Sequence, residues 1–217
     1  MNGSGIKELV IAKLEEKSSF LTPTNTSSPI LVTGDNISEL KPIYDYIDTH
    51  IAEAANEILR IAPLNHLLPK KVENPSATKS TDDEKIGTIT VPEDYLRLYT
   101  LKMKDWSRPV HEAISKNHPN YTNQYNKYTR GIAEKPVVVY SGCGEGGYLS
   151  YYSVYTSHDV SEFSYVQCFG LDNEYTDKVA EAIALNTAKK IMEVFGNADG
   201  ITIMHNELTS VLENMKL

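Results

Sequence analysis

The chain has 217 residues, of which 41% are hydrophobic and 23% are charged, a composition typical of a globular protein with one domain, or with one domain and an appendage. Its formal net charge of −8 at pH 7 argues against a general nucleic-acid binder, because neutralising phosphates requires an excess of Lys and Arg. No apolar run is long enough to cross a bilayer, and the first residues do not read as a secretory signal, so we expect an intracellularly made protein with no membrane partner.

The chain opens with a predicted amphipathic helix over residues 6–17. Ile6, Val10 and Leu14 recur at every fourth position, with charged residues on the other faces. Residues 18–34 follow as an expected loop, because they are rich in Ser, Thr and Pro.

The strongest periodic signal spans about residues 37–62 and predicts a long helix. Its apolar residues are spaced alternately by three and four, which places them on one helical face. Pro42 suits the first turn of this helix, and Pro63 ends it. The stripe packs either inside its own bundle, which is the favoured interpretation, or against a helix of another subunit, and the two are compatible. Its members are Ile37, Leu40, Tyr44, Ile47, Ile51, Ala54, Ile58 and Ile61.

The middle of the chain is predicted to be rich in β-strand. A long polar connector, residues 64–87, comes first, and we expect it to become ordered only on assembly, because polar segments gain little burial alone. Beyond it, β-branched and aromatic runs predict short strands, with short helices between some of them. The expected strands are 88–91, 96–104, 136–140, 149–155 and 163–168, and the expected helices are 110–115 and 119–128.

The last part of the chain is predicted to be helical. Asp172 is a plausible N-cap, an apolar face continues to Phe195, and Gly196 stops that helix. A second three-four stripe runs from Ile201 to Met215. The sequence therefore predicts one α+β domain over residues 1–217. Its helical core is expected at about 37–62 and 172–216, with a small antiparallel β insertion at about 88–168 and long loops.

Candidate catalytic groups are few and lack a supporting signature. Residues 142–147 are rich in glycine but lack the Lys and Ser/Thr of a phosphate-binding loop, so a hairpin turn is the simpler interpretation. Cys143, His158 and Asp159 are a conceivable nucleophile, base and orienting group. The spacing of His and Cys matches no metal motif, and the only other cysteine is Cys168, which favours a reducing compartment over a disulfide framework. We expect no enzymatic activity, no cofactor and no metal.

Tyrosine is unusually frequent, with 14 Tyr against 4 Phe and one Trp. Tyrosine is an amphipathic contact residue that is enriched at protein interfaces. Base stacking is disfavoured without accompanying Lys and Arg, and the remaining interpretation is that alternate tyrosines simply face solvent on strands. Nine of them lie between residues 121 and 165: Tyr121, Tyr125, Tyr128, Tyr140, Tyr148, Tyr151, Tyr152, Tyr155 and Tyr165.

Several short runs form a distinctive series in the middle of the chain. They are residues 91–98 (VPEDYLRL), 106–110 (WSRPV), 121–126 (YTNQYN), 130–131 (RG) and 135–137 (KPV). This series, within roughly residues 88–140, resembles the head-to-tail connector (adaptor, or ring) proteins of short-tailed phages, especially those of the crAss-like phages. The order of bundle helix, long loop, β insertion and C-terminal helices also fits that family.

The resemblance implies a structural virion protein, assembled in the host cytoplasm. It would form a ring of identical subunits, expected to be a dodecamer, that docks below the portal protein, contacts adjacent ring or tail proteins and lines the DNA channel. The DNA would pass without specific binding, which suits an acidic wall. The position of the ring in the stack stays open. Candidate subunit-interface residues on the two helical stripes are Tyr44, Ile47, Ile51, Ile58, Met204, Leu208 and Val211.

Two alternatives remain open on the sequence. One is another tail-hub or tail-completion subunit, which would share these features. The other is a soluble enzyme that depends on Cys143.

Overall fold

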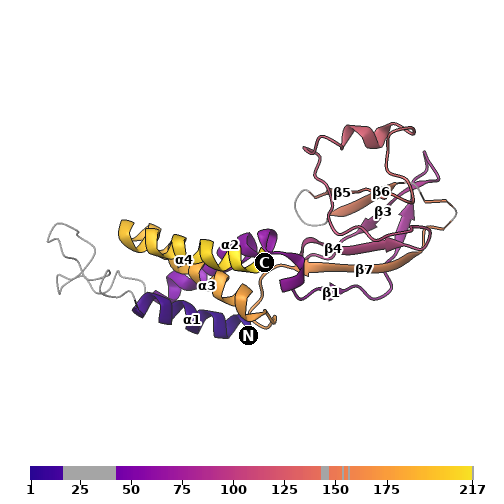
Figure 1. The fold of residues 1–217 in the computed structure, drawn as a ribbon. Coiled ribbons are helices and arrows are strands. Elements are labelled where there is room, and N and C mark those ends of the chain that lie inside the picture. Colours follow the sequence, from indigo (N-terminus) through magenta and orange to yellow (C-terminus); the bar gives the residue numbers. More distant parts are fainter. Residues whose placement is uncertain (17–42, 143–146, 153, 156, 217) are drawn as a thin grey trace. The chain divides into compact units, whose positions relative to one another are not determined.

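A computed structural model describes residues 1–16, 43–142, 147–152, 154–155 and 157–216. The chain divides into two compact units, which we call the helical unit (Met1–Leu68 with Cys168–Leu217) and the β-rich unit (Pro69–Gln167) (Figure 1). About 41% of the chain is helical and 23% is strand, and all strand pairs are antiparallel. The predicted α+β class is therefore confirmed.

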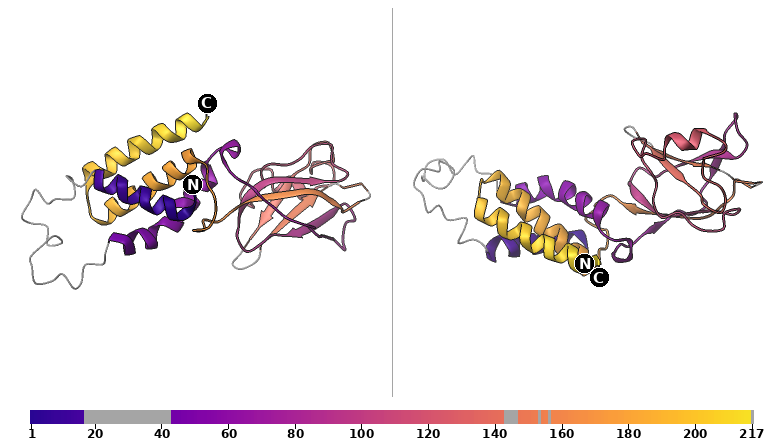
Figure 2. Two further views of the ribbon diagram at one scale, coloured as in Figure 1. Left: turned by 90° about the horizontal axis from the view of Figure 1, so that it is seen from below. Right: turned by 45° about the horizontal axis from the view of Figure 1, so that its top comes forward.

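The helical unit is built around one central helix. The helix α3 packs against each of the three others, and its buried residues lie on several faces. Many of those buried residues are alanines, which let neighbouring helices approach closely. Figure 2 shows α3 and α4 side by side. The helices are α1 (Gly3–Glu16), α2 (Ile43–Ile61), α3 (Asp177–Val194) and α4 (Ala198–Lys216).

The third helix begins four residues later than the sequence suggested. Its N-cap position is Thr176, so the prediction of Asp172 as N-cap was wrong. The chain before it is held in a turn, because the hydroxyl of Tyr175 contacts both backbone groups of Gly170, and the Tyr175 ring stacks on Phe169 at 5.6 Å. The predicted stop is confirmed at Gly196, which adopts a φ of +67°.

The β-rich unit contains two antiparallel sheets (Figure 2). Buried apolar residues from both sheets form one core. The three-stranded sheet has the order β1-β7-β4 and the four-stranded sheet has the order β2-β3-β6-β5. The β4–β7 register shifts at three places, which explains why the β4 sequence alternates only in part. The strands are β1 (Lys70–Lys71), β2 (Ala77–Lys79), β3 (Ile86–Thr90), β4 (Tyr95–Met103), β5 (Val138–Ser141), β6 (Tyr148–Tyr152) and β7 (Val160–Gln167).

Three local predictions differ from the structure. The connector 64–87 contains a 3-10 turn, Leu64–His66, together with β1, β2 and the start of β3. Residues 110–115 are not helical. Instead, Val110 pairs with Leu101, and Ile114 exchanges backbone hydrogen bonds with the chain at 138–140. Residues 119–128 contain only one short 3-10 helix, Thr122–Tyr125. Lys70–Lys71 and residues 110–115 pair through their backbone with other segments that local sequence does not reveal, whereas the backbone hydrogen bonds of residues 119–128 are local.

Candidate interaction surfaces

Most of the predicted subunit-interface residues belong to the interior of the helical unit. Ile47, Ile51 and Ile58 on α2, and Met204 and Leu208 on α4, are all buried. Contact with another subunit through these five side chains would require the bundle to open. Their burial supports the interpretation in which the stripes pack inside their own bundle.

The last two predicted interface residues are not shown to be interior. Val211 is half-buried, and the side chain of Tyr44 lies outside the described part of the structure. Because the other five are buried, we also consider surfaces formed by other residues.

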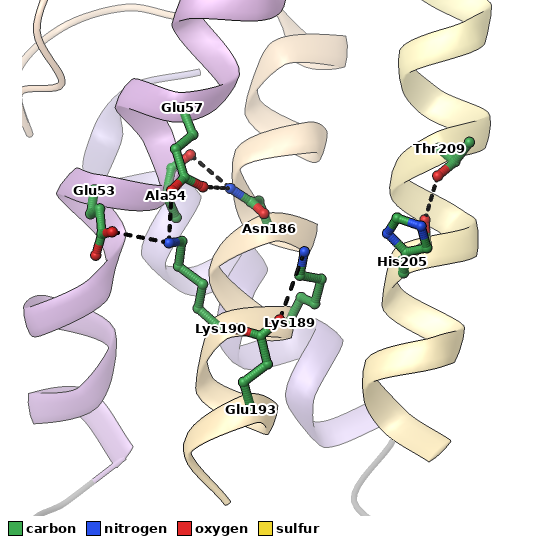
Figure 3. A network of polar contacts seen from close by, with 9 residues as sticks. All are labelled: Glu53, Ala54, Glu57, Asn186, Lys189, Lys190, Glu193, His205 and Thr209. Carbon is green, nitrogen blue, oxygen red and sulfur yellow. Dashed lines mark hydrogen bonds and ion pairs between the residues drawn. The ribbon is translucent and has the colours of Figure 1, made fainter. Parts of the chain in front are cut away.

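A polar clamp fastens α2 to α3 (Figure 3). Lys190 forms ion pairs with Glu53 at 3.2 Å and Glu57 at 2.8 Å, and the buried Asn186 amide donates to the Ala54 carbonyl and to Glu57. Burial raises the pKa of Glu57, but the hydrogen bonds from Lys190 and Asn186 outweigh it and leave the pKa lowered. These two carboxylates thus share one ammonium group within the chain.

The ring nitrogens of His158, the conceivable catalytic base, are both engaged by groups of the β-rich unit. The Tyr151 hydroxyl lies 2.5 Å from His158 Nδ1, and the Glu84 carbonyl lies 2.8 Å from Nε2. A carbonyl only accepts, so Nε2 carries a proton, and in the neutral imidazole Nδ1 accepts from Tyr151. Asp159 pairs with Lys104 at 3.8 Å and does not orient His158. Cys143 lies outside the described residues.

A second polar cluster surrounds Asp94. Its carboxylate accepts hydrogen bonds from Tyr165 at 2.6 Å and from Lys70 at 2.8 Å, which ties β1 and β7 to the turn before β4. Burial raises the pKa of Asp94, but these two donors outweigh it, so the pKa is lowered. Asp94 therefore serves the packing of the sheet.

Metal-binding and membrane-spanning features were sought over the described ranges. No three His, Cys, Asp or Glu side chains in this part of the chain gather closely enough to hold a metal ion. None of the described helices has the length and apolar character needed to span a bilayer.

The structure separates the tyrosines into core and surface residues. Tyr151, Tyr152 and Tyr165 are buried in the β-rich unit, where burial is the largest cause that raises each pKa to about 12. Tyr125 and Tyr128 are 72% and 84% exposed, and neither lies on a strand. Their exposure is a property of an irregular segment and not of strand alternation.

We call residues 115–130 the tyrosine segment. Its sequence, SKNHPNYTNQYNKYTR, contains no acidic residue. The rings of Tyr121 and Tyr125 meet edge to face with their hydroxyls in contact, and Lys127 Nζ lies 5.0 Å from the centre of the Tyr128 ring. Tyr and Asn are the residues that antibody loops use for recognition, because they give contact area and adaptable hydrogen bonds.

Internal hydrogen bonds hold the tyrosine segment in shape. The buried Gln124 donates to the Asn120 carbonyl at 3.0 Å and accepts from the Gly131 amide at 2.9 Å. Thr129 donates to the Asn123 carbonyl at 3.0 Å. A surface that is already ordered loses less conformational entropy when it binds.

The net charge is distributed unevenly between the two units. The helical unit contains 17 acidic and 9 basic residues, whereas the β-rich unit contains 12 of each. The whole excess of negative charge therefore belongs to the helical unit. The net charge of the whole chain does not reveal this partition, because the partition depends on which segments pack into which unit.

Comparison with known proteins assigns no family to the chain, so its function is argued from the sequence and from the surfaces described above. No protein-family model matches the sequence, and no curated protein is significantly similar to it.

Proposed function

We propose that this protein is a head-to-tail connector subunit of a short-tailed phage, a structural virion protein without catalytic activity. Copies of the chain would form a closed ring below the portal, with the portal and adjacent ring or tail proteins as further partners. The observation that carries the proposal is the connector-like series of runs at residues 91–137, which falls within a β-rich unit inserted between α2 and α3.

The exposed tyrosine segment supports a binding role for that unit. One of the connector-like runs, residues 121–126, lies within this segment. An ordered and exposed group of Tyr and Asn suits a protein-binding surface, whereas a run that served only packing would be buried.

The charge of the helical unit supports a position beside DNA that does not bind it. Negatively charged walls repel phosphates, so a genome can slide past without sticking. An acidic helical unit and a neutral β-rich unit would let one surface face the channel while the other contacts protein.

The proposal is tested on purified phage particles. Quantitative mass spectrometry should find as many copies of this chain as of the portal protein. Symmetric cryo-electron microscopy should place them in a ring directly below the portal. A tail-hub or tail-completion subunit would instead appear at the tail and at a different copy number. Absence of the chain from the particle, or isolated copies in it, would refute the connector role.

The enzyme alternative has its own test. Particles that carry Cys143→Ala should assemble and infect normally, because the proposal gives this thiol no chemical role. Loss of infectivity with normal assembly would favour an enzyme over a structural subunit.

A further inference from the structure

We infer that the tyrosine segment of one copy docks on the acidic turn of a neighbouring copy, where the acidic turn is residues 171–177 before and at the start of α3. This inference rests on the proposed function, because it names the contact that would close the ring. It joins two different surfaces that every copy carries, which is the heterologous type of contact that generates rings.

The tyrosine segment carries two positive charges that no ion pair among the described residues compensates. Lys116 and Lys127 are exposed, and neither forms an ion pair with any residue in the described ranges. Arg130 differs, because it is paired with Asp83 at 2.6 Å. Lys127 lies between Tyr125 and Tyr128 in the sequence, and its Nζ is 5.0 Å from the centre of the Tyr128 ring, so cationic and aromatic groups are offered together.

The acidic turn is the matching surface on the helical unit. Asp172, Glu174 and Asp177 are exposed, and within the described part of the chain none of them forms an ion pair. The neighbouring Lys178 donates to the Asn214 carbonyl at 3.3 Å. By contrast, Asp48, Glu53 and Glu57 of α2 are already paired with lysines.

The acidic turn also offers an apolar contact in a fixed shape. Leu171 is 43% exposed, and it lies beside Asp172 in the sequence. The turn is held by Asn173, which donates to the Cys168 carbonyl at 3.1 Å, and by the contacts of Tyr175 with Gly170. Tyrosine rings that pack on Leu171, with lysines beside the carboxylates, would combine an apolar centre with a charged rim.

A contact between two tyrosine segments is disfavoured by the same charges. Two copies that met through this surface would bring Lys116 and Lys127 of one chain against the lysines of the other. Like charges in such a contact are repulsive, whereas opposite charges select the partner and its orientation. The partner favoured by charge is therefore the acidic turn of a second copy.

The test uses two charge-reversal variants of the full chain. One variant carries Lys116→Glu with Lys127→Glu, and the other carries Asp172→Lys with Glu174→Lys. Sedimentation velocity over a concentration series should show each variant self-associating roughly tenfold more weakly than the wild type. An equimolar mixture of the two should recover association, because opposite charges then face each other in alternating copies.

Control variants separate this contact from general charge effects. Lys71→Glu with Lys85→Glu changes two exposed lysines of the β-rich unit outside the tyrosine segment and should leave association unchanged. Tyr125→Ala should weaken association about tenfold, whereas Tyr155→Ala, at another exposed tyrosine, should not. Circular dichroism and thermal unfolding confirm that each variant folds.

Carbodiimide cross-linking of intact particles gives a second measurement. The reagent joins a lysine amine to a carboxylate as an amide, with loss of water, only where the two are in contact. We expect links from Lys116 or Lys127 to Asp172 or Glu174 in a dimer-sized product. The same links in monomeric free protein would show a contact within one chain and would overturn the inference.

The outcomes distinguish this inference from the connector proposal. If particles contain the ring but the cross-links join other residues, or if the mixed variants do not recover association, the docking contact is wrong and the connector proposal stands. If the mixed variants recover association but particles lack the chain, the docking contact stands and the connector proposal fails. Equal association of the wild type and the Lys116→Glu, Lys127→Glu variant would also overturn the docking contact.

Discussion

The ion pair between Arg130 and Asp83 offers a sharp test of how the β-rich unit is held together. Arg130 Nη1 lies 2.6 Å from Asp83 Oδ2, and the side chains are 10% and 35% exposed. The other Asp83 oxygen accepts the Lys85 amide at 2.8 Å. The pair therefore joins the turn before β3 to the end of the tyrosine segment, two parts of the chain that are far apart in sequence.

The two partners should not be equally costly to remove. Asp83→Asn leaves a nearly covered guanidinium without its counter-charge, and uncompensated buried charges cost about 3–5 kcal/mol. Because Asp83 is about one-third exposed, solvent screening reduces this to about 2 kcal/mol. Arg130→Met leaves a carboxylate that still accepts the Lys85 amide and water, so we expect a loss of only about 1 kcal/mol.

The unfolding of the β-rich unit can be followed separately. Trp106 is the only tryptophan of the chain; it is 3% exposed within the core of this unit, so its fluorescence reports on that core. Urea unfolding of the full chain should give the free energy for each variant. Glu84→Gln is the control, because the Lys79–Glu84 pair is exposed and should change stability by less than about 0.5 kcal/mol.

The pH dependence of the same variants gives an independent check. The hydrogen bond from Arg130 is the largest cause that lowers the pKa of Asp83 below its ordinary value of 3.8, and the Lys85 amide adds to it. A lowered folded-state pKa stabilises the protein above the ordinary value, and this contribution is lost as pH falls through the folded-state pKa. The stability gap between wild type and Asp83→Asn should therefore shrink below about pH 4. An equal or larger cost for Arg130→Met, or a gap that acid does not change, would refute the reasoning.

Three further substitutions test other parts of the structure. Gly87→Ala should destabilise the β-rich unit by about 2 kcal/mol or more, because a Cβ there would overlap the Tyr151 hydroxyl; unchanged urea unfolding by fluorescence would contradict this packing. Gly196→Ala should cost about 1 kcal/mol through its positive φ alone, since a Cβ meets nothing within 4 Å; thermal unfolding by circular dichroism measures it, and no loss would argue against the left-handed turn. Met204→Ala should destabilise the free subunit by about 2–4 kcal/mol, whereas Val194→Ala, at a half-exposed position, should cost far less; equal costs in chemical unfolding would mean that Met204 is not in the core.

The periodic parts of the sequence determined much of the fold. The stripe at 37–62 predicted α2, and the apolar pattern at 172–216 with its break at Gly196 predicted α3 and α4. Residues 96–104 predicted β4 within one residue at each end. These predictions succeed because amphipathic periodicity records which side of an element faces a core.

The tertiary structure decided which surfaces are free. An apolar stripe looks the same whether its partner is in the same chain or in another, and only the packing around α3 showed that Ile51 and Met204 are interior. The tyrosines give a second example. Tyr151 is buried because it lies on a strand that packs against the core, whereas Tyr128 is exposed because it lies beyond a short 3-10 turn.

The sequence by itself determined the α+β class, the helical stripes and the absence of acidic residues at 115–130. It did not determine the pairing of β1 and β2, because these short strands hydrogen-bond through backbone groups that every residue carries, and β1 finds its partner in the distant β7. Nor did it show that charge and exposed tyrosine are divided between two compact units, since that division depends on which distant segments pack together.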